Sequence, residues 1–219
     1  MTQDHRPVAG AHAPVVLWIA ALCALPEAIF TLAETPLLGL EGLRRTAIVH
    51  GAFWPGLLRD WGALYPGQQA LMFVSYAFLH GGFLHLLFNM LMVLHLGREA
   101  VARLGQWGFV LLYLVTAAGG AAGFALLSAS PGPMVGASGA VFGLFGAMQY
   151  WDLQRRRASR ASLAPFWQLM AGLVLMNIVL LVMLGGMLAW QAHLGGYVAG
   201  FGMAWWVTPT PRHRFRGFG

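Results

Sequence analysis

Residues 136–151 read GASGAVFGLFGAMQYW, a stretch without a charged side chain in which Gly139 and Gly143 stand four apart. Small residues at this spacing allow two membrane helices to lie very close together. A loop rich in Pro, Gly and Ser precedes the stretch, and a cluster of Arg follows it. We therefore expect a short membrane helix that begins at Ser138 and ends near Trp151.

The rest of the chain has the same apolar character. Of its 219 residues, 58% are hydrophobic and 9% are charged, whereas a soluble domain carries about 25% charged residues. A helix that spans a bilayer needs about 20 mostly apolar residues. Six apolar runs approach that length, at residues 14–33, 82–96, 107–127, 138–151, 165–184 and 187–207. The pattern predicts an all-α polytopic membrane protein with six transmembrane helices.

The chain divides into one membrane domain and two short ends. We expect a cytoplasmic N-terminal segment over residues 1–13, a six-helix domain over residues 14–207 and a basic cytoplasmic tail over residues 208–219. Residues 34–76, between the first two apolar runs, mix Arg and Trp with Pro and Gly. That composition is typical of an interfacial loop whose short helices lie in the headgroup region. Pro26 interrupts the first run, so we expect this helix to kink or to end early.

All 13 basic residues are Arg, and they lie in the gaps between the apolar runs rather than on one face, so we expect no nucleic-acid partner. With six spans, ten Arg residues lie on the side of the termini and three on the opposite side. The three are Arg44, Arg45 and Arg59. The positive-inside rule then places both termini in the cytoplasm. The use of Arg alone is typical of a GC-rich bacterial genome, so we expect a bacterial inner (cell) membrane.

Polar side chains inside a membrane are costly and usually mark function. His85 and Asn89 lie in the second run, Ser138 begins the fourth, and His193 lies near the start of the sixth. Residues 138–151 make a helix of only about 21 Å, against a hydrocarbon core of about 30 Å. Such a helix, ending at the cytoplasmic Arg cluster, is recessed from the outer face. We expect all four polar residues at a similar depth, about 10 Å below the outer surface.

The spacing of small residues explains how Ser138 and His193 can meet. Gly196 and Gly200 lie on the His193 face of their helix, three and seven residues further on. Close contact with the glycines of the fourth helix would bring Ser138 within hydrogen-bond reach of His193. A Ser hydroxyl becomes a nucleophile when a base takes its proton, and His suits that role near neutral pH. No Asp or Glu lies at this depth on the adjacent helices, so we expect a Ser–His dyad without a carboxylate.

The surroundings of Ser138 suit a developing oxyanion. Ser138 lies at a helix N-terminus, where free N–H groups and the positive end of the helix dipole favour negative charge. His85 and Asn89 are four apart on one helix face and can add side-chain donors. Phe142, one turn after Ser138, can hold the His193 ring by packing.

The sequence implies neither a metal site nor a cofactor. Cys23 is the only cysteine, which excludes an intrachain disulfide and a Cys-rich metal site. His85 and His193 lack a third strong ligand at their depth. His80 is expected at the outer interface, and His95 in solvent near the cytoplasmic end.

Three motifs, in this order along six helices, resemble those of the rhomboid family of intramembrane proteases: His85-Leu-Leu-Phe-Asn89, Gly136-Ala-Ser-Gly139 and Ala192-His193-Leu-Gly-Gly196. The similarity covers about residues 14–207. The resemblance implies a rhomboid-like bundle with a short, recessed fourth helix. It also implies a serine endopeptidase that cleaves transmembrane protein substrates in the lipid bilayer, near the outer face. Ser138 would be the nucleophile and His193 the base, while His85 and Asn89 would help to form the oxyanion hole.

The resemblance also implies that substrates reach the site beside the fifth helix, with the following loop, about Leu184 to Met187, acting as a cap. The chain departs from the family pattern at two places. Many members have Tyr where this chain has Phe142, which keeps ring packing but removes a hydroxyl. A Trp-Arg pair often seen before the second helix is absent, and residues 68–72 read QQALM.

Two other functions fit a membrane protein of this kind. A catalytically inactive relative would bind membrane proteins without cutting them, although such relatives usually lack the Ser or the His. A small transporter would use the buried His residues as a proton relay. Against it, the chain shows no inverted repeat and few charged residues in its helices.

Overall fold

The computed structural model describes residues 13–35, 40 and 42–208. This part of the chain is built of helices, with one isolated β-bridge between two loops and no strand. The α-helices are α1 (Pro14–Ala33), α2 (Leu43–Gly51), α3 (Gln68–Ser75), α4 (Phe83–Leu127), α5 (Ser138–Ser159), α6 (Ala164–Met183) and α7 (Trp190–Val207). The prediction of an all-α protein is confirmed for these residues. The predicted N-terminal segment and basic tail lie almost entirely outside them.

Three helices of the described part, α1, α4 and α6, are long and apolar enough to cross a membrane. Large apolar side chains on their outer surfaces are exposed. Trp18 of α1 and Val182 of α6 keep 69% and 75% of their surface accessible. Extended apolar surfaces of this kind are stable against lipid rather than water. The chain is therefore an integral membrane protein, while the number of six spans stays a prediction.

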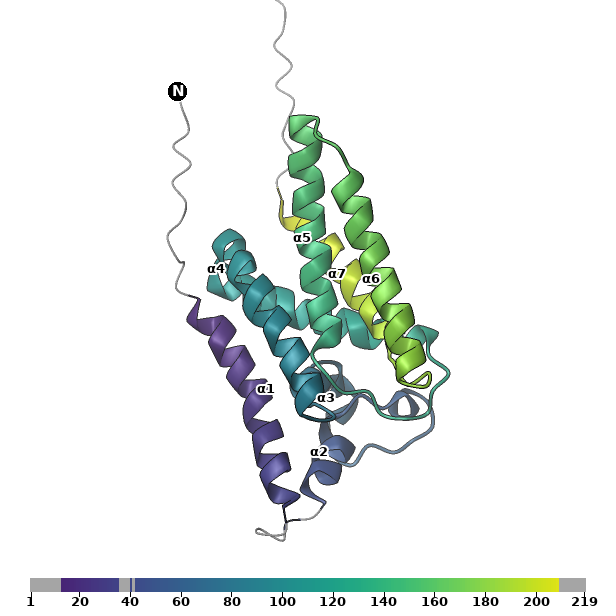
Figure 1. Ribbon diagram of the computed structural model, residues 1–219. Coiled ribbons are helices and arrows are strands. Elements are labelled where there is room, and N and C mark those ends of the chain that lie inside the picture. The colour runs from purple at the N-terminus through teal and green to yellow at the C-terminus, as the bar shows by residue number, and fades with distance from the viewer. Residues whose placement is uncertain (1–12, 36–39, 41, 209–219) are drawn as a thin grey trace, which may run out of the picture.

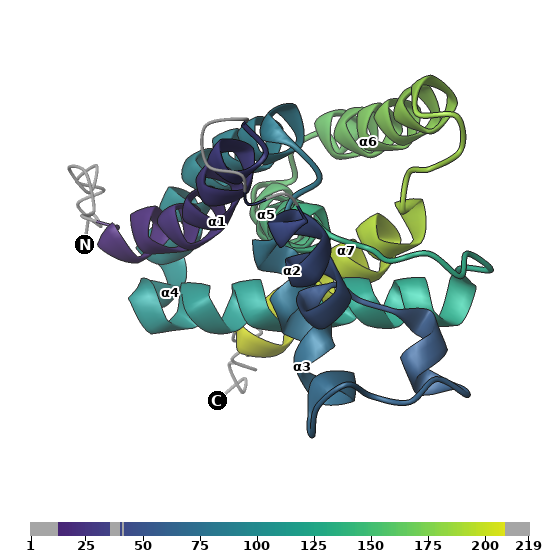
Figure 2. The same cartoon turned by 90° about the horizontal axis from the view of Figure 1, so that it is seen from below.

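The helix α4 unites the second and third predicted helices. The predicted runs at residues 82–96 and 107–127 fall in its two arms, which meet at Gly105. Gly105 has a φ of 73° and a ψ of 175°, a conformation outside the helical region that glycine adopts at little cost. The two arms therefore point in clearly different directions (Figures 1 and 2).

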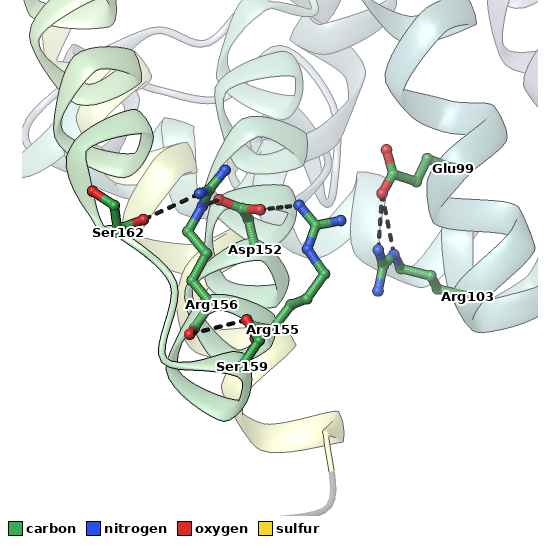
Figure 3. A network of polar contacts seen from close by, with 7 residues as sticks. All are labelled: Glu99, Arg103, Asp152, Arg155, Arg156, Ser159 and Ser162. Atoms are coloured by element: carbon green, nitrogen blue, oxygen red, sulfur yellow. Dashed lines mark hydrogen bonds and ion pairs between the residues drawn. The ribbon is translucent and has the colours of Figure 1, made fainter.

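The helix α5 is longer than predicted, with 22 residues that extend past Trp151 to Ser159, or about 33 Å. Its last turns carry Asp152, which pairs with Arg155 and Arg156 (Figure 3). Opposite charges three and four residues apart, with basic residues near the C-terminus, favour continued helix. The prediction of a short fourth helix is wrong in length. Only its apolar part, up to Trp151, is short.

The helix α1 runs through Pro26 to Ala33, so of the two expected outcomes, a kink or an early end, the early end is wrong. Proline removes one helical hydrogen bond, but the turn that follows is fixed by a buried ion pair. Glu27 is almost fully buried, and one of its carboxylate oxygens lies 2.7 Å from an Arg44 nitrogen in α2. Residues 34–76 otherwise contain a short 3₁₀-helix, Pro55–Leu58, and α3, in agreement with the expected short helices.

Contacts between glycines place α5 and α7 side by side at the centre of the bundle. A Cβ atom at Gly196 would overlap the carbonyl oxygen of Gly139, and one at Gly200 would overlap that of Gly143. The two backbones therefore touch directly, as the spacing predicted. In Figures 1 and 2, α5 lies between α4, α6 and α7.

The helices α4 and α6 flank this pair in different ways. The second arm of α4 also contacts α7 through backbone, because a Cβ at Gly195 would lie 2.9 Å from the Cα of Gly123. By contrast, α6 buries only Phe166 and Leu173 among its described side chains. The helix α6 is thus the loosely packed wall of the bundle.

Candidate active site

Ser138 and His193 form a direct hydrogen bond. The Ser138 Oγ lies 2.9 Å from the His193 Nε2. Ser138 is the first residue of α5, and His193 lies in the first turn of α7. The contact between the first turns of these two helices follows from the glycine packing described above. His193 is buried, whereas Ser138 keeps some accessible surface.

The loop before Ser138 is fixed by backbone hydrogen bonds to residues within the 34–76 region. The N–H groups of Phe53 and Met134 each donate to the other residue's carbonyl oxygen, at 3.0 and 2.9 Å. The Gly136 N–H donates to the Tyr76 carbonyl oxygen at 3.0 Å. The breaker-rich loop is therefore held in place, and the first turn of α5 with it.

His85 packs against this loop. Gly136 has a φ of 121°, which favours glycine, and an added Cβ would lie 2.6 Å from the His85 Nε2. His85 thus contacts the residue two positions before Ser138. The Asn89 Nδ2 donates to the His85 carbonyl oxygen at 2.9 Å within α4. The structure therefore brings His85 to the site, whereas the Asn89 amide donates within its own helix.

His80 occupies a position that the sequence did not indicate. It was expected at the outer interface, yet only 1% of its surface is accessible. Its Nε2 accepts a hydrogen bond from the Ala137 N–H, directly before Ser138, at 3.4 Å. The side chain is therefore buried within the protein, against the loop before α5, while its depth near the outer interface stays a prediction. His95 lies exposed on α4, as expected.

Arg44 connects this region to α1. Its guanidinium pairs with Glu27 and with Glu34, at 2.7 Å in each case, and donates to the His80 carbonyl oxygen at 3.1 Å. The hydrogen bond from Arg44 lowers the pKa of the Glu34 carboxyl. One Arg side chain therefore joins the end of α1 to the segment that carries His80.

Two further residues hold the His193 ring. The Phe142 ring stacks on it, with centroids 4.2 Å apart and planes inclined by 4°. The Asn177 Oδ1 lies 2.6 Å from the His193 Nδ1. Asn177 was not predicted from the sequence. It could have been, because a polar side chain inside an apolar run usually marks function, and Asn177 is the one amide within the run at residues 165–184 apart from Gln168 near its start.

An apolar cavity of about 360 Å³ opens beside His193, between α5, α6 and α7. Its walls are mostly aliphatic and aromatic. The lining residues include Phe142, Leu173, Asn177, Leu181, Trp190 and His193. The candidate site thus combines a hydrogen-bonded Ser–His pair with an adjoining apolar pocket of the kind that binds small apolar groups. Among the described residues, no cluster of three or more His, Cys, Asp or Glu side chains could hold a metal ion.

Comparison with known proteins gives a consistent result. A sequence model of the Rhomboid domain matches residues 67–210. The chain is 30% identical to "RHOMBOID-like protein 5" of Arabidopsis thaliana, over 65% of this chain and 45% of the relative. It is 32% identical to "Rhomboid protease GlpG" of Yersinia pestis, over 64% of this chain and 49% of the relative.

A third relative is "RHOMBOID-like protein 6, mitochondrial" of Arabidopsis thaliana, which is 29% identical over 73% of this chain and 50% of the relative. The chain spans about half the length of the curated relatives that it matches. The matched domain contains Ser138, His193, His85 and Asn89, and covers more than half of the chain. This chain belongs to the rhomboid family.

Proposed function

We propose that this protein is an intramembrane serine endopeptidase in which Ser138 is the nucleophile and His193 the general base. The observation that carries the proposal is the 2.9 Å hydrogen bond between the Ser138 Oγ and the His193 Nε2. This is the distance at which a base can take the proton from a hydroxyl as it attacks. Membership of the rhomboid family and the similarity to a rhomboid protease support it.

The reaction proceeds in two halves. Ser138 attacks the carbonyl carbon of the scissile bond while its proton moves to the His193 Nε2. His193 then gives this proton to the leaving amine, and an acyl-enzyme remains on Ser138. A water molecule, deprotonated by His193, hydrolyses the ester and restores the Ser138 hydroxyl.

Each tetrahedral intermediate carries an oxyanion that needs donors. The first N–H groups of a helix have no acceptor within it, so those in the first turn of α5, which begins at Ser138, can donate to the oxyanion. His85, against Gly136, can supply a further donor. The Asn89 Nδ2 has a second N–H besides the one donated to the His85 carbonyl oxygen, and this N–H can donate to the oxyanion. Gly136, Gly139, Gly196 and Gly200 support the site by allowing these close approaches.

The substrates are transmembrane segments of other membrane proteins. The apolar cavity beside His193 fits an apolar side chain next to the cleaved bond. Access beside α6 requires the smallest disruption of packing, because α6 buries few side chains. The turn at Gly185 and Gly186, within the loop from Leu184 to Met187, would then act as the cap.

The proposed setting in the membrane follows from the charge distribution. Six spans, with the two arms of α4 counted separately, leave both termini in the cytoplasm and open the site to the outer face. The recess of Ser138 now rests on the short apolar part of α5, up to Trp151, rather than on the length of the helix. A bacterial inner membrane suits the Arg-only composition.

The test is cleavage of a model transmembrane substrate in liposomes, with mass spectrometry of the products. We expect one cut near the outer end of the substrate helix, and no cut with the Ser138→Ala variant. Binding of the substrate without a cut by the wild type would favour an inactive relative. Cleavage by Ser138→Ala would contradict the proposed nucleophile.

A further inference from the structure

We propose that Asn177 is a positioning residue that fixes the tautomer of His193, so that the site is a Ser–His–Asn triad rather than a dyad. The inference rests on the proposed function, because it assigns a role toward His193 as the base. Its basis is the contact of 2.6 Å between the Asn177 Oδ1 and the His193 Nδ1.

The orientation of the Asn177 amide is set by its own helix. Its Nδ2 donates to the Leu173 carbonyl oxygen, one turn earlier in α6, at 2.8 Å. Turning the amide over would bring the Oδ1 against that carbonyl oxygen, and two acceptors would face each other. Only one orientation of the amide makes both hydrogen bonds, and it presents the Oδ1 to His193.

This orientation decides which nitrogen of His193 carries the proton. An amide oxygen can only accept, so the Nδ1 must donate to it. In the neutral ring the Nε2 is then without a proton and accepts from the Ser138 hydroxyl. In the opposite tautomer the Nε2 would carry the proton, and the ring could not take the proton of Ser138.

An amide suits this position better than a carboxylate would in the membrane. In soluble serine hydrolases a buried carboxylate orients the base, but an ionised side chain at membrane depth is costly. Asn177 accepts the same hydrogen bond without a net charge. The bond strengthens when His193 becomes positively charged during the reaction.

The Phe142 ring restricts His193 from another side but cannot select a tautomer. Stacking at 4.2 Å fixes the ring plane. Rotation of the ring within that plane is limited by its hydrogen bonds to Ser138 and Asn177. The two contacts therefore divide the task, with Phe142 setting the plane and Asn177 setting the proton position.

The first measurement reads the tautomer directly and does not depend on activity. The ¹⁵N NMR shifts of labelled histidine distinguish a protonated Nδ1 from a protonated Nε2, and a His193→Gln spectrum identifies the signals. We expect the Nδ1–H form in the wild type and a mixture in Asn177→Leu, which keeps the size of the side chain and removes the acceptor. The same tautomer in both proteins would overturn the inference.

The second measurement is the rate at which a fluorophosphonate labels Ser138, together with kcat and KM on the model substrate. We expect Asn177→Leu to lower the labelling rate and kcat about 10-fold, as for one lost hydrogen bond of about 1.4 kcal/mol, with KM unchanged. Asn177→Asp keeps an acceptor oxygen for the Nδ1–H but adds the charge that the membrane disfavours, so it should restore the Nδ1–H tautomer and only part of the rate. Leu175→Ala, at an exposed position on the same helix outside the cavity lining, should behave as the wild type.

The outcomes separate this inference from the proposed function. If the fluorophosphonate labels the wild type and Asn177→Leu at the same rate, the role of Asn177 is overturned and the proposed protease function still stands. Equal losses of rate in Asn177→Leu and Asn177→Asp, with the same tautomer mixture in both variants, would reduce Asn177 to a packing role and also overturn the inference. A wild type that neither labels nor cleaves would contradict both proposals, even if the tautomer were fixed.

Discussion

The two ends of α5 are held by different kinds of interaction. At its start, Ser138 bonds to His193, and the helix packs on α7 through backbone contacts at glycines. At its other end, Asp152 pairs with Arg155 and Arg156 on side chains that keep some contact with solvent (Figure 3). Exposed ion pairs contribute about 0–1 kcal/mol each, whereas closely packed interiors respond to a single methylene group.

This contrast shows how one helix serves two purposes. The start of α5 is a fixed site without charged side chains, which suits a position inside a membrane. The far end is a charged segment in which no single pair is essential. Single substitutions should therefore have large effects at the start of α5 and small effects at its end.

The largest effect is expected at the proposed base. His193→Ala should lower turnover at least about 10⁴-fold, because the residues of a nucleophile–base pair act as a unit. Circular dichroism should still show a folded helical protein, since the glycine contacts between α5 and α7 remain. His95→Ala, at an exposed position on α4, is the control and should cleave at the wild-type rate. Residual turnover near the wild-type value would remove His193 from the mechanism.

A smaller loss is expected at the proposed oxyanion donor. Asn89→Ala should lower kcat about 10- to 1000-fold, the usual effect of losing one such donor. Because the Asn89 amide donates within α4 in the structure, the loss should appear in kcat and not in substrate binding. Steady-state kinetics in liposomes would measure it. An unchanged kcat would leave the oxyanion to His85 and the backbone.

The contact between helices should respond to a single methyl group. Gly196→Ala should destabilise the fold by about 1–3 kcal/mol, because its Cβ would overlap the Gly139 carbonyl oxygen and push α7 away from α5. Gly202→Ala is the same change on the same helix at a position with open space around it. It should stabilise α7 by up to about 1 kcal/mol. Equal unfolding midpoints for the two variants would contradict this packing.

The smallest effect is expected at the far end of α5. Asp152→Asn removes both ion pairs with Arg155 and Arg156, yet unfolding free energy should fall by only about 0–1 kcal/mol. Turnover should not change. The difference should shrink further at high salt, which screens exposed charges. A loss of unfolding free energy comparable to that of Gly196→Ala would mean that the two ends of α5 are not distinct.

Much of this arrangement could be predicted from local patterns. Apolar length located the helices, and the four-residue spacing of glycines indicated which helices touch. The contact between Ser138 and His193 follows from those two observations, while the roles of both residues remain predictions.

Other features depend on charge pairing along a helix or on contacts between residues far apart in the sequence. The end of α5 was misplaced because a helix continues through charged residues when they pair along it. The burial of His80 was not predicted because it involves the loop before α5, far away in sequence. Asn177 was missed because its significance depends on α6 lying against α7, which the spacing along α6 alone does not indicate.

The most direct test of the account is covalent labelling of the nucleophile. A fluorophosphonate is incubated with the wild type, Ser138→Ala and His193→Ala in liposomes, and the labelled residue is found by mass spectrometry. The account predicts a label on Ser138 in the wild type and none in either variant, because an unactivated hydroxyl is a weak nucleophile. Equal labelling of the wild type and Ser138→Ala, or a His193→Ala variant that labels at the wild-type rate, would contradict the activation of Ser138 by His193.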